Sequence, residues 1–268
     1  MKNKSSNYTL GAKSYSLKIG WLYPELMNTY GDRGNITILA KRCQWRGIKA
    51  EVKHFDPGFS ISELKKCDLL LMGGAQDKQQ EIVNKDLKRI KAPLSEMIEK
   101  ATPGLYVCGG FQFLGKYYKE ADGKVIGGLG IFDLFTENPG ENHPRLIGNI
   151  AIEPSFSFNH KSSIINHKSI IIGFENHGGR TYLGKKIKPL GKVIKGFGNN
   201  GKDGFEGAVF KNSFGTYLHG PILPKNPHFA DYLLSLSLRR KYPDFLLEPL
   251  DDDLERTANK FMLDKIGI

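Results

Sequence analysis

Cys108 stands at the end of a short apolar run and directly before two glycines, an arrangement that can present a nucleophile. The run 105–107 has the pattern of a buried strand, and the next helix is expected to start at Cys108. Such a sharp strand-to-helix turn carries the nucleophile of many α/β enzymes at the carboxyl end of the sheet, and small residues after it let the backbone fold back. Although a free cysteine is more often inert core, this context favours a nucleophile.

A nucleophilic thiol needs a base, and His219 is the best candidate. It ends the β-like run Phe214–Leu218 and precedes Gly220, so we expect it at the carboxyl edge where a parallel sheet gathers its active site. Paired with Cys108, its imidazole could take the thiol proton and return it to a leaving group. His177, within a glycine-rich segment, is the main rival.

Acyl transfer by a thiol also needs N–H donors for the oxyanion that forms during attack. The amide of Gly109, one residue beyond Cys108, is the first expected donor. Gly74 and Ala75 follow another short apolar run and could turn further amides toward the same point. We therefore predict an oxyanion hole formed by these three residues.

The elements that must position these residues alternate along the first half of the chain. Strands are expected at 17–23, 50–55, 67–72 and 105–107, and helices at 35–45, at 61–66, from Asp77, and again from Pro93, where the ring should end one helix and open the next. Strands that alternate with helices indicate βαβ units, so the pattern predicts a mostly parallel sheet.

The second half has denser glycine and shorter apolar runs. We expect strands at 147–152, 163–174 and 206–218 that extend the same sheet, partly antiparallel, then a helix at 226–240 and a last helix after Asp252. The predicted organisation is a disordered lead-in at 1–14, one catalytic domain at 15–245, and a helical tail at 246–268.

Composition excludes several classes of protein. No stretch of the 268 residues approaches the roughly 18 apolar residues of a membrane span, and the polar start is no signal peptide. Three widely spaced cysteines argue against a disulfide framework and a zinc site, and indicate the cytoplasm. The net charge of +11 is concentrated in the lysine-rich stretch 161–202. Without an RNA-binding signature we do not expect a nucleic-acid partner; the stretch could instead dock a protein or approach anionic lipid.

Five segments of the sequence match a known family. They are Met27–Asn35 (MNTYGDRGN), Gly73–Asp77 (GGAQD), Cys108–Gly115 (CGGFQFLG), Gly173–Thr181 (GFENHGGRT) and Gly215–Asn226 (GTYLHGPILPKN). In this order and at this spacing they resemble class I glutamine amidotransferases of the cobyric acid synthase-like branch. The glutaminase subunits of lipid II isoglutaminyl synthases are the most similar group, and the resemblance spans roughly residues 17–240.

The resemblance implies a three-layer, flavodoxin-like fold with helices on both faces of a mostly parallel sheet. It also implies that Cys108 attacks L-glutamine with His219 as base, while Arg145 and Gln112 hold the substrate. Ammonia would pass to a Mur-ligase-like partner that uses ATP and Mg²⁺ to amidate the D-glutamate α-carboxyl of the lipid II stem peptide. The heterodimer would be cytoplasmic, reaching the inner membrane face through the complex. This chain has no phosphate-binding P-loop motif, and no cofactor or metal is expected on it.

Two positions depart from the family pattern. Tyr106 stands where many members have glycine, so the turn at Cys108 could be shaped differently. Pro221 stands where many have the glutamate that orients the histidine, so we expect a carboxylate from elsewhere, such as the partner chain. Two alternatives stay open at this point: the same chemistry for a cobalamin-type synthetase, and a non-catalytic glutamine-binding scaffold.

Overall fold

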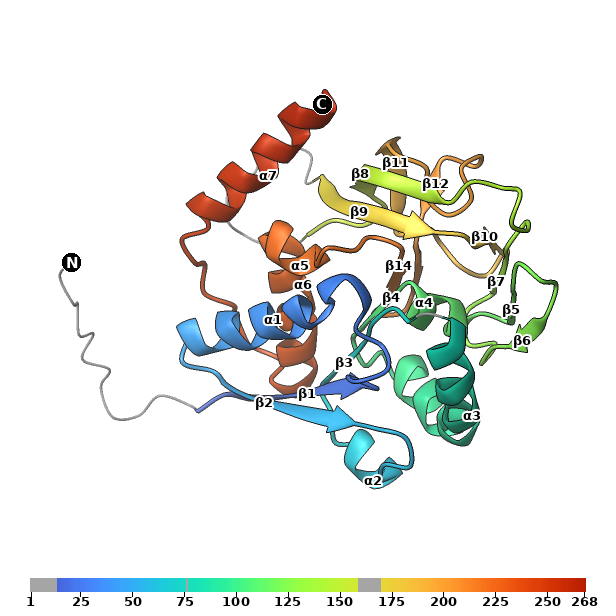
Figure 1. Ribbon diagram of the computed structural model, residues 1–268. Helices are drawn as coiled ribbons and strands as arrows, with labels where there is room; N and C mark the ends of the chain where they lie inside the picture. Colours follow the sequence, from blue (N-terminus) through green and yellow to red (C-terminus); the bar gives the residue numbers. More distant parts are fainter. Residues whose placement is uncertain (1–13, 76, 159–169) are drawn as a thin grey trace.

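A six-stranded sheet forms the centre of the molecule (Figure 1). The computed structural model describes residues 14–75, 77–158 and 170–268. The sheet has the order β13-β14-β4-β3-β1-β2, with bounds β1 (Ser16–Leu22), β2 (Lys49–Phe55), β3 (Leu69–Met72), β4 (Gly104–Val107), β13 (Ala208–Phe210) and β14 (Ser213–Thr216). All neighbours pair in parallel except β13 with β14. The parallel part thus has the strand order of flavodoxin-like folds, as predicted.

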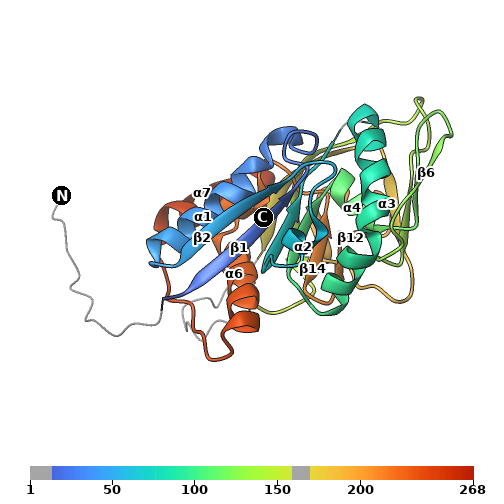
Figure 2. The same ribbon diagram turned by 90° about the horizontal axis from the view of Figure 1, so that it is seen from below.

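Helices cover both faces of this sheet because its central strands are apolar on both sides (Figure 2). Leu69 and Leu71 face the cluster that includes Leu39 and Leu233, whereas Leu70 and Met72 face the cluster that includes Leu87. The first face is covered by α1 (Arg33–Trp45), α5 (Ile222–Lys225) and α6 (Pro227–Lys241), and the second face by α3 (Asp77–Glu99). The remaining short helices are η1 (Thr29–Gly31), α2 (Ile61–Leu64) and α4 (Gly109–Leu114).

Helix α3 corrects one expectation. The sequence predicts a break at Pro93, but a single helix of 23 residues runs through it. Proline removes one main-chain hydrogen bond from a helix interior, at a cost of about 3 kcal/mol. Leu87, Ile90, Leu94 and Ile98 are all buried on both sides of the proline, and each contributes about 1.5–3 kcal/mol of burial. Burial of this continuous apolar face outweighs the lost bond.

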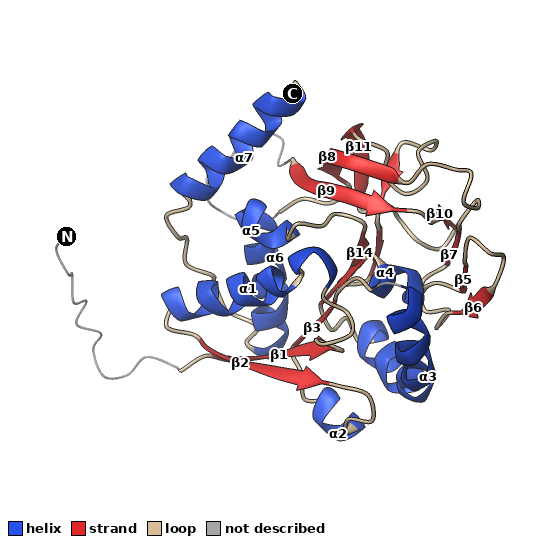
Figure 3. Cartoon of the chain, in the orientation of Figure 1, coloured by secondary structure: helices blue, strands red, loops and turns tan. Residues whose placement is uncertain are grey.

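The second half of the chain builds two further four-stranded sheets, where the sequence predicts an extension of the first (Figure 3). One sheet has the order β10-β7-β5-β6, and its strands are β5 (Tyr117–Lys119), β6 (Val125–Gly127), β7 (Leu134–Glu137) and β10 (Arg180–Leu183). The other sheet has the order β12-β11-β8-β9, and its strands are β8 (Leu146–Pro154), β9 (Ile171–His177), β11 (Gly191–Lys195) and β12 (Phe205–Glu206). Among the described strands of this half, only β13 and β14 join the central sheet.

The strand expected at 206–218 is divided into β12, β13 and β14, because the backbone turns at Gly207 (φ +62°) and Lys211 (φ +55°). The strand expected at 163–174 begins outside the described residues and is seen as β9 from Ile171. The lead-in at 1–14 also lies outside them, apart from its last residue.

The last helix, α7 (Asp253–Ile266), follows Asp252 as predicted and packs beside α5 and β9. Its Asn259 amide donates to the Lys225 carbonyl at 2.9 Å. The predicted division into domain and tail at residue 246 stays a prediction. Across the described part of the chain, every helix is too short or too polar to cross a membrane.

Candidate active site

Cys108 occupies the sharp turn that the sequence predicts between β4 and α4. Its backbone has φ 52° and ψ −107°, a conformation that costs a non-glycine residue about 1–3 kcal/mol and persists only where neighbours enforce it. The Cys108 N–H donates to the Thr216 carbonyl at 2.8 Å, and its own carbonyl accepts from the Gln112 N–H at 2.9 Å. The strained turn is therefore held from both sides, and it leaves the thiol partly exposed.

Glycine allows α4 to approach the end of β3. A side chain at Gly110 would begin 2.7 Å from the Met72 carbonyl oxygen, and the Gly110 N–H donates to Gly73 at 3.1 Å. Tyr106, where the sequence departs from the family pattern, is fully buried in the core. The Tyr106 side chain therefore packs in the core and does not prevent the sharp turn at Cys108.

His219 is buried and follows β14 in the chain. Its imidazole and the Cys108 side chain both lie next to Gly74. A Cβ built on Gly74 would lie 3.1 Å from His219 Cε1 and 3.2 Å from Cys108 Cβ. Burial alone would lower the pKa of His219, but the Cys108 sulfur and the Asp32 carboxylate together raise it to about 10. The imidazole is thus held as an imidazolium that can pair with a thiolate and donate a proton.

Asp32 is the third member of the cluster, and it belongs to this chain. Its Oδ1 lies 3.6 Å from His219 Nδ1, and its Oδ2 accepts the Gly74 N–H at 2.8 Å. The sequence analysis expected a carboxylate from elsewhere, such as the partner chain, and did not identify Asp32. The signal was available, because Asp32 lies in a polar run after β1, whose carboxyl end shares an edge with β4 and β14.

Pro221 explains how Asp32 reaches the histidine. A Cβ on Gly34, at the start of α1, would lie 2.3 Å from Pro221 Cγ, so the two backbones meet there in close contact. This contact brings the start of α1, and with it Asp32, against the loop that carries His219. Proline in place of the family's glutamate therefore accompanies a carboxylate from Asp32, the residue that directly precedes α1.

The residues expected in the oxyanion hole differ in their surroundings. The Gly74 N–H donates to Asp32, which corrects the expectation that it points at the reacting centre. Gly109 is the first residue of α4, where N–H groups have no partner within the helix and remain available to an anion. The roles of Gly109 and Ala75 stay predictions.

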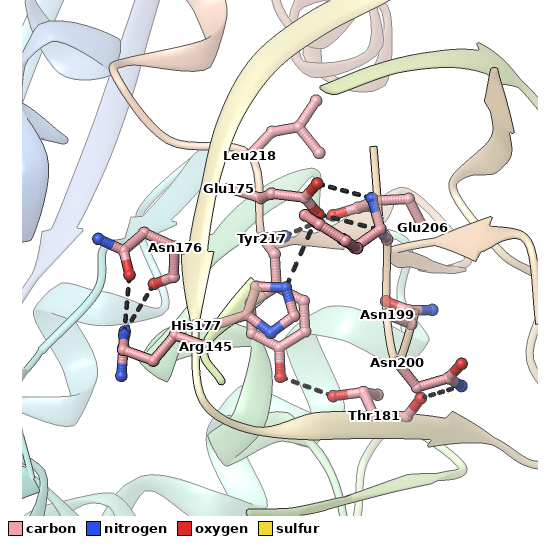
Figure 4. A network of polar contacts seen from close by, with 12 residues as sticks. Arg145, Glu175, Asn176, His177, Thr181, Asn199, Asn200, Glu206, Tyr217 and Leu218 are labelled. Atoms are coloured by element: carbon pink, nitrogen blue, oxygen red, sulfur yellow. Dashed lines mark hydrogen bonds and ion pairs between the residues drawn. The ribbon is translucent and has the colours of Figure 1, made fainter. Parts of the chain in front are cut away.

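The two residues expected to bind substrate also differ. Arg145 is exposed, and Asn176 holds its guanidinium (Figure 4). Gln112 is buried one turn after the nucleophile and donates to the Tyr217 hydroxyl at 3.1 Å. Gln112 is therefore part of the buried packing around α4, and its contact with substrate stays a prediction.

His177, the rival base, is engaged elsewhere. Its ring stacks on Tyr217 with centroids 3.7 Å apart (Figure 4). Its Nδ1 contacts the Gly179 carbonyl at 2.7 Å. Burial lowers its pKa despite the nearby Glu175 carboxylate. A neutral, stacked histidine supports the packing of β9, so His219 remains the base that the geometry favours.

A buried carboxyl group supports the segment that leads to His219. Glu206 Oε1 accepts from the Tyr217 N–H at 2.6 Å and from the Thr216 hydroxyl at 3.0 Å, and that hydroxyl accepts from the Leu218 N–H at 3.0 Å. Burial raises the pKa of Glu206 to about 8, which keeps it protonated near neutral pH. These bonds fix the backbone immediately before the histidine.

The other two cysteines belong to the core. Cys43 and Cys67 are buried, and burial raises the pKa of both thiols to about 12. A thiol with such a pKa is a poor nucleophile near neutral pH. Cys108 is thus the cysteine whose surroundings suit chemistry.

Comparison with known proteins agrees with this geometry. The model of the CobB/CobQ-like glutamine amidotransferase domain matches residues 18–227. The chain is 42% identical over 251 residues to the GatD subunit of lipid II isoglutaminyl synthase (glutamine-hydrolyzing) from Staphylococcus aureus, covering 94% of this chain and 96% of that protein. It is 38% identical over 254 residues to the same subunit from Streptococcus pneumoniae, covering 95% and 91%. A solved glutamine amidotransferase shares the fold, with a TM-score of 0.52, 14% identity, and coverage of 82% of this chain and 98% of that chain.

Proposed function

This chain belongs to the CobB/CobQ-like glutamine amidotransferase family, and from that membership we propose that it is the glutamine-hydrolysing subunit of a lipid II isoglutaminyl synthase. One observation carries the catalytic part of the proposal. Cys108 sits on a strained turn and meets His219 beside Gly74, with Asp32 behind the imidazole. The arrangement has the nucleophile, base and orienting group that thiol-based acyl transfer needs.

The site can perform glutamine hydrolysis in two steps. In this proposal the Cys108 thiolate attacks the carboxamide carbon of L-glutamine, and the Gly109 N–H stabilises the oxyanion. Collapse breaks the C–N bond, the His219 imidazolium protonates the departing nitrogen, and ammonia leaves a glutamyl thioester. Water then loses a proton to His219 and attacks the thioester, which releases glutamate and restores the thiol.

We propose that the ammonia passes to a Mur-ligase-like subunit, which binds ATP and Mg²⁺ and amidates the D-glutamate α-carboxyl of the lipid II stem peptide. Two relatives that this chain covers nearly end to end are subunits of that synthase, which supports this acceptor over a cobalamin-type one. The heterodimer would work in the cytoplasm, at the inner membrane face where lipid II lies.

Covalent labelling with a glutamine-mimicking diazo-ketone tests the proposal. We expect one adduct on Cys108 by peptide mapping, suppressed by excess glutamine and absent from Cys108→Ala. Cys43→Ala is the matched control, because that thiol is buried, and it should label like the wild type. A scaffold without catalytic function would show no adduct, with or without the synthetase subunit.

The acceptor is tested separately with the assembled complex. We expect ¹⁵N from the amide of glutamine to appear in the lipid II stem peptide when ATP and the synthetase subunit are present. If Cys108 were labelled but no ¹⁵N reached lipid II, the proposed glutaminase activity would stand and the proposed lipid II acceptor would be wrong.

A further inference from the structure

Strand β9 contacts two parts of the candidate site, the backbone of His219 and the side chain of Arg145. The Phe174 carbonyl accepts the His219 N–H at 2.7 Å, and the Phe174 N–H donates to the His219 carbonyl at 3.3 Å. Two residues farther along the same strand, Asn176 contacts Arg145. One strand therefore bonds to the backbone of the candidate base and to the arginine expected to bind the substrate carboxylate.

Successive side chains of a strand point to opposite sides, so the side chains of β9 contact different residues on its two sides. Glu175 and His177 lie toward Tyr217, while Asn176 lies on the opposite side with Arg145 (Figure 4). Glu175 accepts the N–H groups of Phe197 and Gly198 at 2.7 and 2.9 Å. The side away from Arg145 is thus anchored, which fixes the direction in which Asn176 points.

Asn176 binds one edge of the Arg145 guanidinium and leaves another edge available. The Arg145 Nε donates to Asn176 Oδ1 and the Nη2 donates to the Asn176 carbonyl, both at 2.9 Å. Two contacts on one edge fix the plane of the group. The edge formed by Nη1 and Nη2 keeps donors in the geometry that binds a carboxylate bidentately. No carboxylate of the described residues forms an ion pair with Arg145.

Gly178 keeps space open beside that edge. A Cβ there would lie 3.3 Å from Arg145 Nη1 and 2.8 Å from Asn138 Nδ2. The Asn138 Oδ1 already accepts the Gly140 N–H at 3.1 Å, so the amide nitrogen is directed as a donor. Two donor groups thus converge beside a glycine, an arrangement suited to an anion.

The neighbouring arginine has a different task. Arg180 donates through Nη1 to the Gly178 carbonyl at 2.7 Å and through Nη2 to the Pro144 carbonyl at 2.6 Å. It therefore ties the segment before Arg145 to the turn after β9. Arg145 is left as the guanidinium available to a ligand.

We propose that Asn176 is a positioning residue that orients Arg145 toward the α-carboxylate of glutamine and so sets selectivity for amides that carry this group. The inference rests on the proposed glutaminase function. Without the Asn176 side chain, the Arg145 guanidinium keeps only its contact with the Asn176 main-chain carbonyl. Its plane is then no longer fixed by two contacts, and the substrate loses a preformed partner. The reacting amide and Cys108 are untouched, so ground-state and transition-state binding weaken together, and KM rises while kcat is kept.

The experiment compares wild type, Asn176→Ala and the matched control Asn149→Ala on the adjacent strand β8, each assembled with the synthetase subunit. We expect the KM for glutamine to rise at least about 10-fold in Asn176→Ala, the loss typical of one charge-assisted hydrogen bond. We expect kcat to stay within about 3-fold, because the transition state loses no contact of its own. Toward 4-aminobutanamide, which is glutamine without its α-carboxylate, kcat/KM should be equal in all three proteins.

Covalent labelling gives a second readout. Iodoacetamide, which has no carboxylate, should alkylate Cys108 at the same rate in wild type and Asn176→Ala, whereas the diazo-ketone should label the variant more slowly. An unchanged KM, or equal slowing toward both reagents, would overturn the positioning role. A wild-type complex that neither hydrolyses glutamine nor reacts with the diazo-ketone would instead overturn the proposed function.

Discussion

His219, the candidate catalytic histidine, contacts a carboxylate that lies far away in the sequence. Asp32 raises the pKa of His219 together with the Cys108 sulfur, against the lowering effect of burial. A histidine with a pKa of about 10 keeps its proton through neutral pH and loses it only as the pH rises toward that value. The proton needed by the departing ammonia is thus present where a free imidazole, with a pKa of about 6.5, would have lost it.

We predict that Asp32→Asn lowers kcat for glutamine hydrolysis by about 10²- to 10⁴-fold, the usual contribution of a correctly oriented acid–base group. The pKa of His219 should fall when the carboxylate is lost, so the alkaline limb of the kcat/KM profile should move to lower pH. A pH series of glutaminase rates in the complex measures both effects.

Asp68→Asn is the matched control, since Asp68 lies before β3 at the opposite edge of the sheet, where it accepts the Lys18 N–H. It should leave the profile unchanged. If Asp32→Asn kept the wild-type alkaline limb, a carboxylate from another source, such as the partner, would have to orient His219.

The sequence predicted the reactive pair but missed its third member, for a physical reason. Cys108 and His219 each end an apolar run, and the carboxyl ends of parallel strands meet. Asp32 enters through a turn and the start of α1, and its direction depends on the close contact of Gly34 with Pro221. Periodicity carries no information about such a contact. Asn176 escaped notice similarly, because its role depends on two specific hydrogen bonds to Arg145.

At the scale of elements, the start of α1 controls the site. Gly34 is the second residue of that helix, where alanine would normally stabilise by about 0.5–1 kcal/mol. Here the new methyl group would lie 2.3 Å from Pro221 Cγ. We predict that Gly34→Ala pushes α1 away from the His219 loop and lowers kcat/KM by about 10- to 100-fold, as expected for a misplaced orienting group.

Rescue tests this steric explanation. Pro221→Ala removes the Cγ and leaves a Cβ contact of 3.1 Å, so the Gly34→Ala/Pro221→Ala double variant should recover part of the lost kcat/KM in a glutaminase assay. If the two losses simply added, the contact between these residues would not explain the effect of Gly34→Ala.

The arrangement of the elements could be predicted only in part. The first half alternates buried strands with helices, and its strands lie at nearly the expected residues because long apolar runs leave little choice. The later strands were expected in one sheet, yet β8 pairs with β9 on one side and with β11 on the other, in a separate sheet. Partners of short strands are decided by turns such as those at Gly207 and Lys211, which hydrophobic pattern alone does not reveal.

At the scale of the whole molecule, a buried charge network ties the C-terminal segment to the domain. Arg42, fully buried on α1, contacts Asp231 of α6 at 2.6 Å and Asp252 before α7 at 2.7 Å. Arg46 adds a second contact to Asp231 at 2.6 Å. These two aspartates raise the pKa of Arg42 despite its burial, so the guanidinium stays charged at every accessible pH.

We predict that Arg42→Met lowers the free energy of unfolding by about 3–5 kcal/mol, because two largely buried carboxylates then lose their main counter-charge. Lys41→Met, on the exposed side of the same helix, should change it by less than about 0.5 kcal/mol. Urea unfolding measures both variants, and hydrogen exchange should show α7 losing protection first, since Asp252 links that helix to α1. A variant within about 1 kcal/mol of wild type would mean that Arg46 alone compensates Asp231, and that the contacts of α7 with α5 and β9 hold the C-terminal helix without Arg42.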